Sequence, residues 1–110
     1  MPQWIGPKTT TIAASGSLSG TIMMRGALLG HITMPDALTA GTFNFLTSSQ
    51  VSGGTFRLLY DQYNTIVALV ASGSRSYPLP AELAGADGFR LAGAGTVEAS
   101  NRTFIVNLKG

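Results

Sequence analysis

The sequence contains no cysteine and few charged residues. Without cysteine it can form no disulfide, no thiolate zinc site and no cysteine nucleophile, so its fold must be stabilised by packing and hydrogen bonds. Charged residues make up 11% of the 110 residues, against about 25% in an ordinary soluble protein. No two basic residues are adjacent, and the net charge of +2 is spread thinly along the chain. Since phosphate recognition needs clustered lysine and arginine, we expect no nucleic-acid partner.

Long apolar runs are missing as well. No stretch approaches the ~20 apolar residues of a membrane-spanning helix. Residues 1–10 also lack the charged start and the apolar run of a signal peptide. We therefore expect no membrane partner, and synthesis in a cytoplasm without export by that route. A length of 110 residues suits one domain with a core of its own.

No segment shows a sustained helical stripe; apolar residues alternate with polar ones instead. Phe43 and Phe45 share one side of their segment, and Phe104, Val106 and Leu108 share one side of theirs. This period of two is typical of half-buried strands. We predict eight strands, with 75–79 as an optional ninth, in segments 9–14, 19–24, 28–34, 42–45, 56–60, 65–71, 89–92 and 103–108.

Turn-forming residues separate these segments. Glycine and serine cluster at 15–17, 52–54 and 72–74, and glycine with alanine at 93–95, which favours turns. Eight to nine short strands separated in this way predict an all-β, antiparallel, jelly-roll-like β-sandwich. We assign residues 10–110 to this domain. Residues 1–9 are predicted to be an extended N-terminal arm, because Pro2 and Pro7 disfavour regular structure.

Some strand positions predicted to face outward are apolar, which is unusual for a lone sandwich. They are Leu29, Leu46, Leu59, Val67, Leu69 and Ile105. Two interpretations are open: one subunit covers both sides of its strands at barrel corners, or a sheet face packs against a neighbouring subunit. Trp4 either folds back on the sandwich or anchors the arm on a partner. On the second interpretation the predicted interface residues are Trp4, Leu46, Leu59, Leu69 and Ile105.

No residue pattern indicates catalysis or metal binding. His31 is the single histidine and lies within a predicted strand, away from any nucleophile motif. We interpret it as a partly exposed strand residue, and a small hydrolase that depends on it is the alternative. No spacing among the acids favours a carboxylate pair or a calcium loop. We therefore predict no enzyme, no catalytic or metal-binding residue and no cofactor. The acids are Asp36, Asp61, Glu82, Asp87 and Glu98, and the three aspartates are expected to cap turns.

Tyrosine offers one weak binding signal. Tyr63 lies in the polar segment 61–64 and is the ring best placed to be exposed, where it could contact a glycan, whereas Tyr60 is expected in the core. Segment 93–95 is not followed by a helix and is therefore no phosphate loop. We interpret the glycosylation pattern at 101–103 as a chance match, because we expect no secretory route.

Several stretches resemble small virion-associated proteins of tailed bacteriophages and prophages. The resemblance covers residues 10 to 108 and rests on Ile12-Ala-Ala-Ser-Gly-Ser-Leu-Ser-Gly20, on Leu29-Gly-His-Ile-Thr-Met-Pro35 with Thr42-Phe-Asn-Phe45, and on Leu59-Tyr-Asp61. Segments 88–91 and 101–108 look like the last two strands of that group. The group is defined by strand and turn patterns, so it implies no catalytic residue.

The resemblance implies a structural virion protein. Such proteins are jelly-roll or sandwich modules of capsid decoration, head-spike or tail-attachment type. We expect a capsid decoration (cement) protein, made in the host bacterial cytoplasm, that binds the outer shell of a virion. Its expected partners are the major capsid protein or another virion protein and copies of itself, with a trimer as the natural closed arrangement. The alternative is a glycan-binding module of a phage fibre or tail component, with Tyr63 as the contact residue.

Overall fold

The computed structural model describes residues 4–24, 27, 29–48, 55–84 and 86–109. Within them lie nine strands and one 3-10 turn. In chain order they are β1 (Trp4–Ile12), β2 (Ile22–Met23), β3 (Leu29–Thr33), β4 (Thr42–Ser48), β5 (Arg57–Leu58), β6 (Ala68–Val70), β7 (Ser76–Pro78), η1 (Ala81–Leu83), β8 (Gly88–Gly93) and β9 (Arg102–Lys109).

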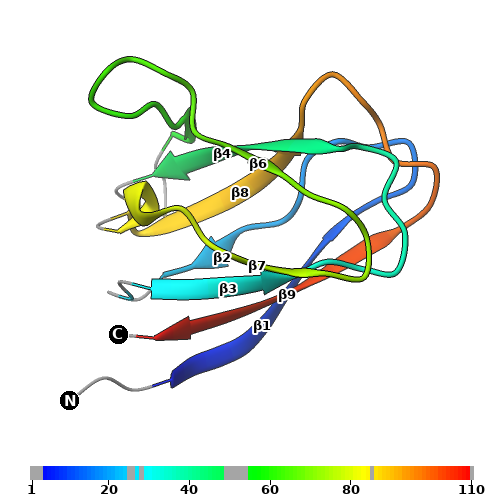
Figure 1. Cartoon of the computed structure of the whole chain (residues 1–110), viewed down its shortest axis with the longest axis horizontal. Helices are drawn as coiled ribbons and strands as arrows, with labels where there is room; N and C mark the ends of the chain where they lie inside the picture. The colour runs from blue at the N-terminus through cyan, green and yellow to red at the C-terminus, as the bar shows by residue number, and fades with distance from the viewer. Residues whose placement is uncertain (1–3, 25–26, 28, 49–54, 85, 110) are drawn as a thin grey trace.

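The strands form two antiparallel sheets that face each other (Figure 1). One has the order β1-β9-β3-β7, and the other has the order β2-β8-β4-β5, with β6 also paired to β4. If β5 and β6 are counted as two parts of one strand, the sandwich has eight strands. Numbered along the chain, these strands lie in the order 1-8-3-6 in the first sheet and 2-7-4-5 in the second. This is the strand arrangement of a jelly roll. The predicted all-β sandwich is confirmed.

The core lies between the two sheets and is built from the alternating residues of the central strands. Phe43 and Phe45 of β4 are fully buried, as are Phe89 of β8 and Phe104 of β9. The rings of Phe43 and Phe104 meet edge to face across the sheets at 5.6 Å, and those of Phe45 and Phe89 lie 5.9 Å apart. Aromatic pairs at such distances add to the free energy of burial. The alternation predicted for 42–45 and 103–108 is confirmed.

The N-terminal segment differs from the prediction. From Trp4 onward it is not an extended arm but strand β1, which pairs antiparallel with β9. The register shifts between Ile5 and Lys8, so Pro7 lies at an irregularity of the pairing. Strand β1 is also at the edge of its sheet, and an edge or a bulge tolerates proline because no neighbour needs its missing N–H group. Residues 1–3 lie outside the described part of the chain.

Two segments have the opposite inside–outside phase from the predicted one. Tyr60, expected in the core, is 48% exposed, and Leu58 is 45% exposed, while Leu59 packs against the core. Val67, expected to face outward, is buried, and Leu69 packs against the core. A shift of one residue moves every side chain of a strand to the other face. Segment 65–71 is apolar on both sides, so its alternation does not select one phase, whereas in segment 56–60 the charged Arg57 beside Leu59 favoured the phase that the structure does not adopt.

The change of phase accompanies an excursion of the chain between β5 and β6. Leu46 of β4 pairs with Leu58 of β5, and Asn44, two residues away on β4, pairs with Ala68 of β6. The segment that pairs with β4 therefore contains extra residues between these two positions. The intervening residues 59–67 form a hairpin, closed by a bridge between Tyr60 and Ile66. The hairpin projects from the sandwich at the end where η1 lies (Figure 1).

Candidate functional site

An open concavity of about 370 Å³ lies where the hairpin meets η1. It is lined by Asp61, Gln62 and Tyr63 of the hairpin and by Ala81 and Glu82 of η1. The volume falls in the lower part of the range of small-molecule sites, about 300–1,000 Å³. The site therefore brings together two segments that are separated in sequence by β6 and β7.

Local hydrogen bonds fix the backbone that carries Tyr63. The Asp61 carboxylate oxygen Oδ1 accepts the amide N–H groups of Tyr63 at 2.8 Å and of Thr65 at 3.0 Å. Asn64 has a φ of 62° and donates its amide to the Asp61 carbonyl at 3.0 Å. Aspartate and asparagine favour such turns because their short side chains bond the nearby backbone and tolerate a left-handed conformation. The prediction that Asp61 caps a turn is confirmed.

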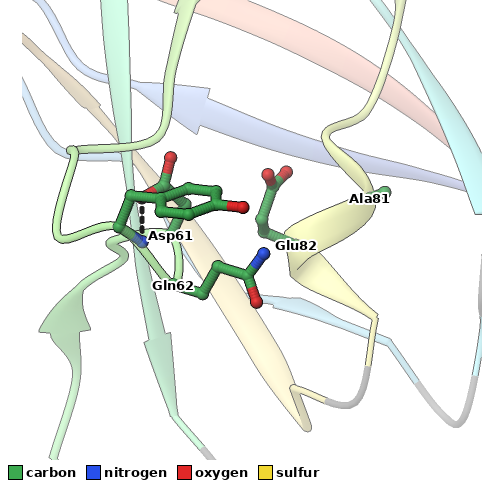
Figure 2. Close-up of a pocket in the computed structure, with 5 residues that line it drawn as sticks. Asp61, Gln62, Ala81 and Glu82 are labelled. Atoms are coloured by element: carbon green, nitrogen blue, oxygen red, sulfur yellow. Dashed lines mark hydrogen bonds between the residues drawn. The ribbon is translucent and has the colours of Figure 1, made fainter.

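The side chains around the concavity are one exposed ring and several hydrogen-bonding groups. Tyr63 is 79% exposed, as its place in the polar segment predicted. Gln62 and Glu82 approach the concavity from the hairpin and from η1 respectively (Figure 2). The lining residues within the described part of the chain carry two carboxylates and no basic group. The concavity can accept hydrogen bonds and contact a flat apolar surface, and its negative charge disfavours anions.

Among the described residues, no group of three or more histidines, cysteines, aspartates or glutamates could hold a metal ion. The same part of the chain also contains no helix that is long and apolar enough to cross a membrane. His31 lies in β3 opposite Pro78 and Asn107 and is exposed, as predicted for a strand histidine.

The outer surface of the sheet β2-β8-β4-β5 is largely apolar. Its residues alternate with the buried Phe43 and Phe45: Leu46 lies opposite both Leu58 and Arg90. Leu58 is 45% exposed and Val70 is 75% exposed. Cross-strand neighbours of this kind share one face of a sheet. We call this surface the apolar face; its residues are Leu18, Thr42, Asn44, Leu46, Leu58, Ala68, Val70, Arg90 and Ala92.

Arg90 is the charged residue of the apolar face. Its guanidinium carbon lies 5.4 Å from the centre of the Phe56 ring, which gives a cation–π contact. Its Nε atom is buried and has no hydrogen-bond partner among the described residues. An unpaired buried polar atom destabilises a structure by about 1–3 kcal/mol. Arg90 places one positive charge on the apolar face, stacked on an aromatic ring.

The outer surface of the sheet β1-β9-β3-β7 is polar by comparison. The hydroxyl groups of Thr11 and Thr103 lie 3.1 Å apart, and those of Thr33 and Ser76 lie 2.9 Å apart. We call this surface the threonine face; its residues are Thr9, Thr11, His31, Thr33, Ser76, Thr103 and Ile105. Threonine suits a strand that is exposed on one side, because it combines a β-branched side chain with a hydroxyl group.

The structure does not bring the predicted interface residues together. Leu46 lies half-buried on the apolar face, whereas Ile105 is 41% exposed on the threonine face. Leu59 and Leu69 pack against the core. The side chain of Trp4 lies outside the described part of the chain. The sequence reasoning missed Val70 because its segment is apolar on both sides, and it missed Leu58 because Arg57 on the other side of that strand favoured the opposite phase.

At the opposite end of the sandwich, Glu98 joins three loops. Its carboxylate accepts the amides of Thr39 at 2.8 Å and Ala40 at 2.9 Å, and the Nε of Arg102 at 3.0 Å. Its backbone pairs with Gly16 and Ser15. We call this end the closed end; it comprises the loops 13–21, 34–41, 71–75 and 94–101 (Figure 1). The sequence reasoning assigned Glu98 no such role.

The charge of Glu98 is stabilised although the residue is only 1% exposed. Burial alone would raise the pKa of this carboxyl group, but the amide hydrogen bonds from Thr39 and Ala40 and the charge of Arg102 outweigh it. They hold the pKa of Glu98 below the ordinary value of a glutamate. Glu98 is therefore a structural carboxylate. The other two predicted turn aspartates, Asp36 and Asp87, lie at bends of the backbone.

No family model and no curated protein matches the chain. The solved structure of the SPBc2 prophage-derived protein YomS is similar over 100% of this chain and 96% of that one, with a TM-score of 0.63 and 10% identity. A structure of Bacillus endospore appendages, described as disulfide-linked pili, matches with a TM-score of 0.46 and 12% identity over 99% of this chain and 85% of that one. The likeness to YomS extends over the whole jelly roll and concerns the fold.

Proposed function

We propose that the chain is a structural protein of a tailed-phage particle and decorates the outer surface of the capsid through its apolar face. The observation that carries this proposal is the exposure of Leu58 and Val70 on the same sheet face as the half-buried Leu46 and Arg90. Exposed apolar patches of this kind mark protein interfaces. The fold that the chain shares with a prophage-derived protein supports a phage origin.

The charge of the apolar face favours a partner other than a second copy. Arg90 lies opposite Leu46 near the middle of the face, and the described residues of this face include no carboxylate. A two-fold contact through the face would bring the Arg90 side chains of two copies close together, which is unfavourable. A capsid surface with apolar side chains and one carboxylate fits better. Arginine is a frequent anchor in such interfaces.

The proposed mechanism is passive. Burial of the apolar face stabilises the complex by about 25 cal/mol per Å² of apolar surface. The contact is repeated at many symmetric positions of a shell, so each one adds a small stabilisation to the whole. The predicted homo-oligomer, with a trimer as its natural form, would be built through surfaces other than the apolar face.

The test adds the purified chain to capsids of the phage that encodes it, assembled without it, and measures co-sedimentation. Leu58→Lys and Val70→Lys should each weaken binding about thirtyfold or more, as expected for interface anchors worth ~2 kcal/mol. Thr9→Lys and Thr103→Lys, with the same charge on the threonine face, are the matched controls and should bind like the original chain. Circular dichroism of every variant checks that the fold is retained.

Two outcomes would count against the proposal. One is a folded chain that ignores such capsids at every concentration tried. The other is loss of binding in the threonine-face variants but not in the apolar-face variants. Size-exclusion chromatography with light scattering measures the mass of the free chain and tests the predicted trimer separately.

A further inference from the structure

We propose that the concavity between the hairpin 59–67 and η1 binds a neutral saccharide, with the Tyr63 ring as its contact surface. This inference goes beyond capsid decoration, because the concavity lies at one end of the sandwich, whereas the apolar face is the outer surface of one sheet. It rests on three features of the described residues: a presented ring, hydrogen-bonding groups around it, and the sign of the local charge.

The ring is presented by a backbone that is already ordered. Asp61 holds the amides of Tyr63 and Thr65, and the bridge between Tyr60 and Ile66 closes the hairpin. A ring that is 79% exposed on such a turn loses little further backbone freedom when a ligand binds. Its flat apolar surface suits the C–H face of a pyranose, and a tyrosine also keeps a hydroxyl group for hydrogen bonding.

The groups around the ring match the hydroxyls of a sugar. The Gln62 amide can both donate and accept hydrogen bonds, and the Glu82 carboxylate accepts them (Figure 2). Sugar hydroxyls are both donors and acceptors, so a pair of an amide and a carboxylate can bind adjacent hydroxyls. The concavity of about 370 Å³ is large enough for one or two sugar rings.

The charge of the concavity selects against anionic sugars. Asp61 and Glu82 both line it, and none of its described lining residues is basic. A sialic or uronic acid would bring a third carboxylate close to these two, which is unfavourable by Coulomb repulsion. A neutral hexose oligomer meets no such penalty. We therefore expect a preference for neutral over acidic oligosaccharides that share the same core.

The experiment applies the full chain to an array of neutral oligosaccharides of glucose, galactose, mannose and N-acetylglucosamine, beside sialylated and uronic-acid counterparts. Calorimetry then measures the Kd for the best neutral ligand. Tyr63→Ala should weaken binding about tenfold or more, whereas Tyr63→Phe should keep most of it, because the ring is retained. Tyr60→Ala is the matched control, since Tyr60 lies on the same hairpin, is exposed and does not line the concavity.

Charge gives a second readout. Glu82→Gln should raise the relative binding of the acidic counterparts, and this shift does not depend on the absolute affinity. The proposal is overturned if no neutral oligosaccharide binds, if acidic ones bind better, or if Tyr60→Ala weakens binding as much as Tyr63→Ala. The capsid assay above is separate: a chain that binds capsids normally after Tyr63→Ala would leave the decoration proposal intact whatever the array shows.

Discussion

At the closed end of the sandwich the loops are hydrogen-bonded to one another, whereas an open concavity lies between the hairpin and η1, which are at the other end (Figure 1). Both ends use carboxylates. Glu98 is buried and satisfied by amides and an arginine, while Glu82 is exposed beside an exposed ring. The comparison teaches that polar loops of one jelly roll can stabilise the fold at one end and remain available to a ligand at the other.

The largest expected effect is at Glu98. Glu98→Ala removes the acceptor of two loop amides and leaves Arg102 without its ion-pair partner. We expect a loss of about 3 kcal/mol in the free energy of unfolding, measured by urea denaturation. The matched change at the other end, Tyr63→Ala, should stay within about 0.5 kcal/mol. Equal losses at both positions would break the comparison.

The close packing of two loops at the closed end gives the second prediction. A Cβ atom added to Gly73 would lie 2.6 Å from the carbonyl oxygen of Asp36, which is backbone and has little room to move. Gly73→Ala should therefore destabilise the fold by about 1–3 kcal/mol. The control is Gly41→Ala, since an added Cβ there meets nothing within 4 Å. Thermal unfolding of the two variants should differ clearly.

The lowered pKa of Glu98 predicts a dependence of stability on pH. Because the pKa is lower in the folded chain than in the unfolded one, the stabilisation is present above the unfolded value of about 4.3. It is lost as the pH falls from there through the folded pKa. The Tm of the original chain should therefore fall more steeply below about pH 4.3 than that of Glu98→Gln. Parallel pH profiles would show that Glu98 is not the group responsible.

The smallest effect on stability is expected at the open end. Asp61→Ala removes a side chain that accepts two amides of an exposed turn. We expect it to lower the free energy of unfolding by less than about 1 kcal/mol. The same variant should weaken saccharide binding, because the backbone that presents Tyr63 is no longer fixed. A large stability loss with unchanged binding would reverse the roles of the two ends.

Sequence patterns predicted the parts of the fold in which alternation is unambiguous. Phe43 in β4 stands between the polar Thr42 and Asn44, and the predicted burial of Phe43, Phe45 and Phe104 is confirmed. The phase of Leu59 could not be predicted, because Leu58 and Tyr60 on either side are equally suited to burial. A continuous apolar run does not indicate which side of the strand faces the core.

The candidate site was predictable only in part. The exposure of Tyr63 follows from the turn chemistry of Asp61 and Asn64, which is local. Glu82 reaches the same concavity from η1, and that proximity depends on how the strands between them are paired. Glu98 is a similar case, since its partners Thr39 and Ala40 are backbone amides of a distant loop. Amide donors are present at nearly every residue, so no sequence signal marks these two.

The hairpin between β5 and β6 projects from the sandwich, so its tip can change without a change in the pairing of the sheets. Since β4 pairs with the residues on both sides of the hairpin, the tip 61–65 can be lengthened or replaced without moving any other strand, provided that Leu59 and Val67 keep their packing against the core. Lengthening a surface loop has a small entropic cost, about 0.6 kcal/mol for each doubling. Grafted peptides, or a library of randomised residues, should be accepted at this position while the two sheets keep their register.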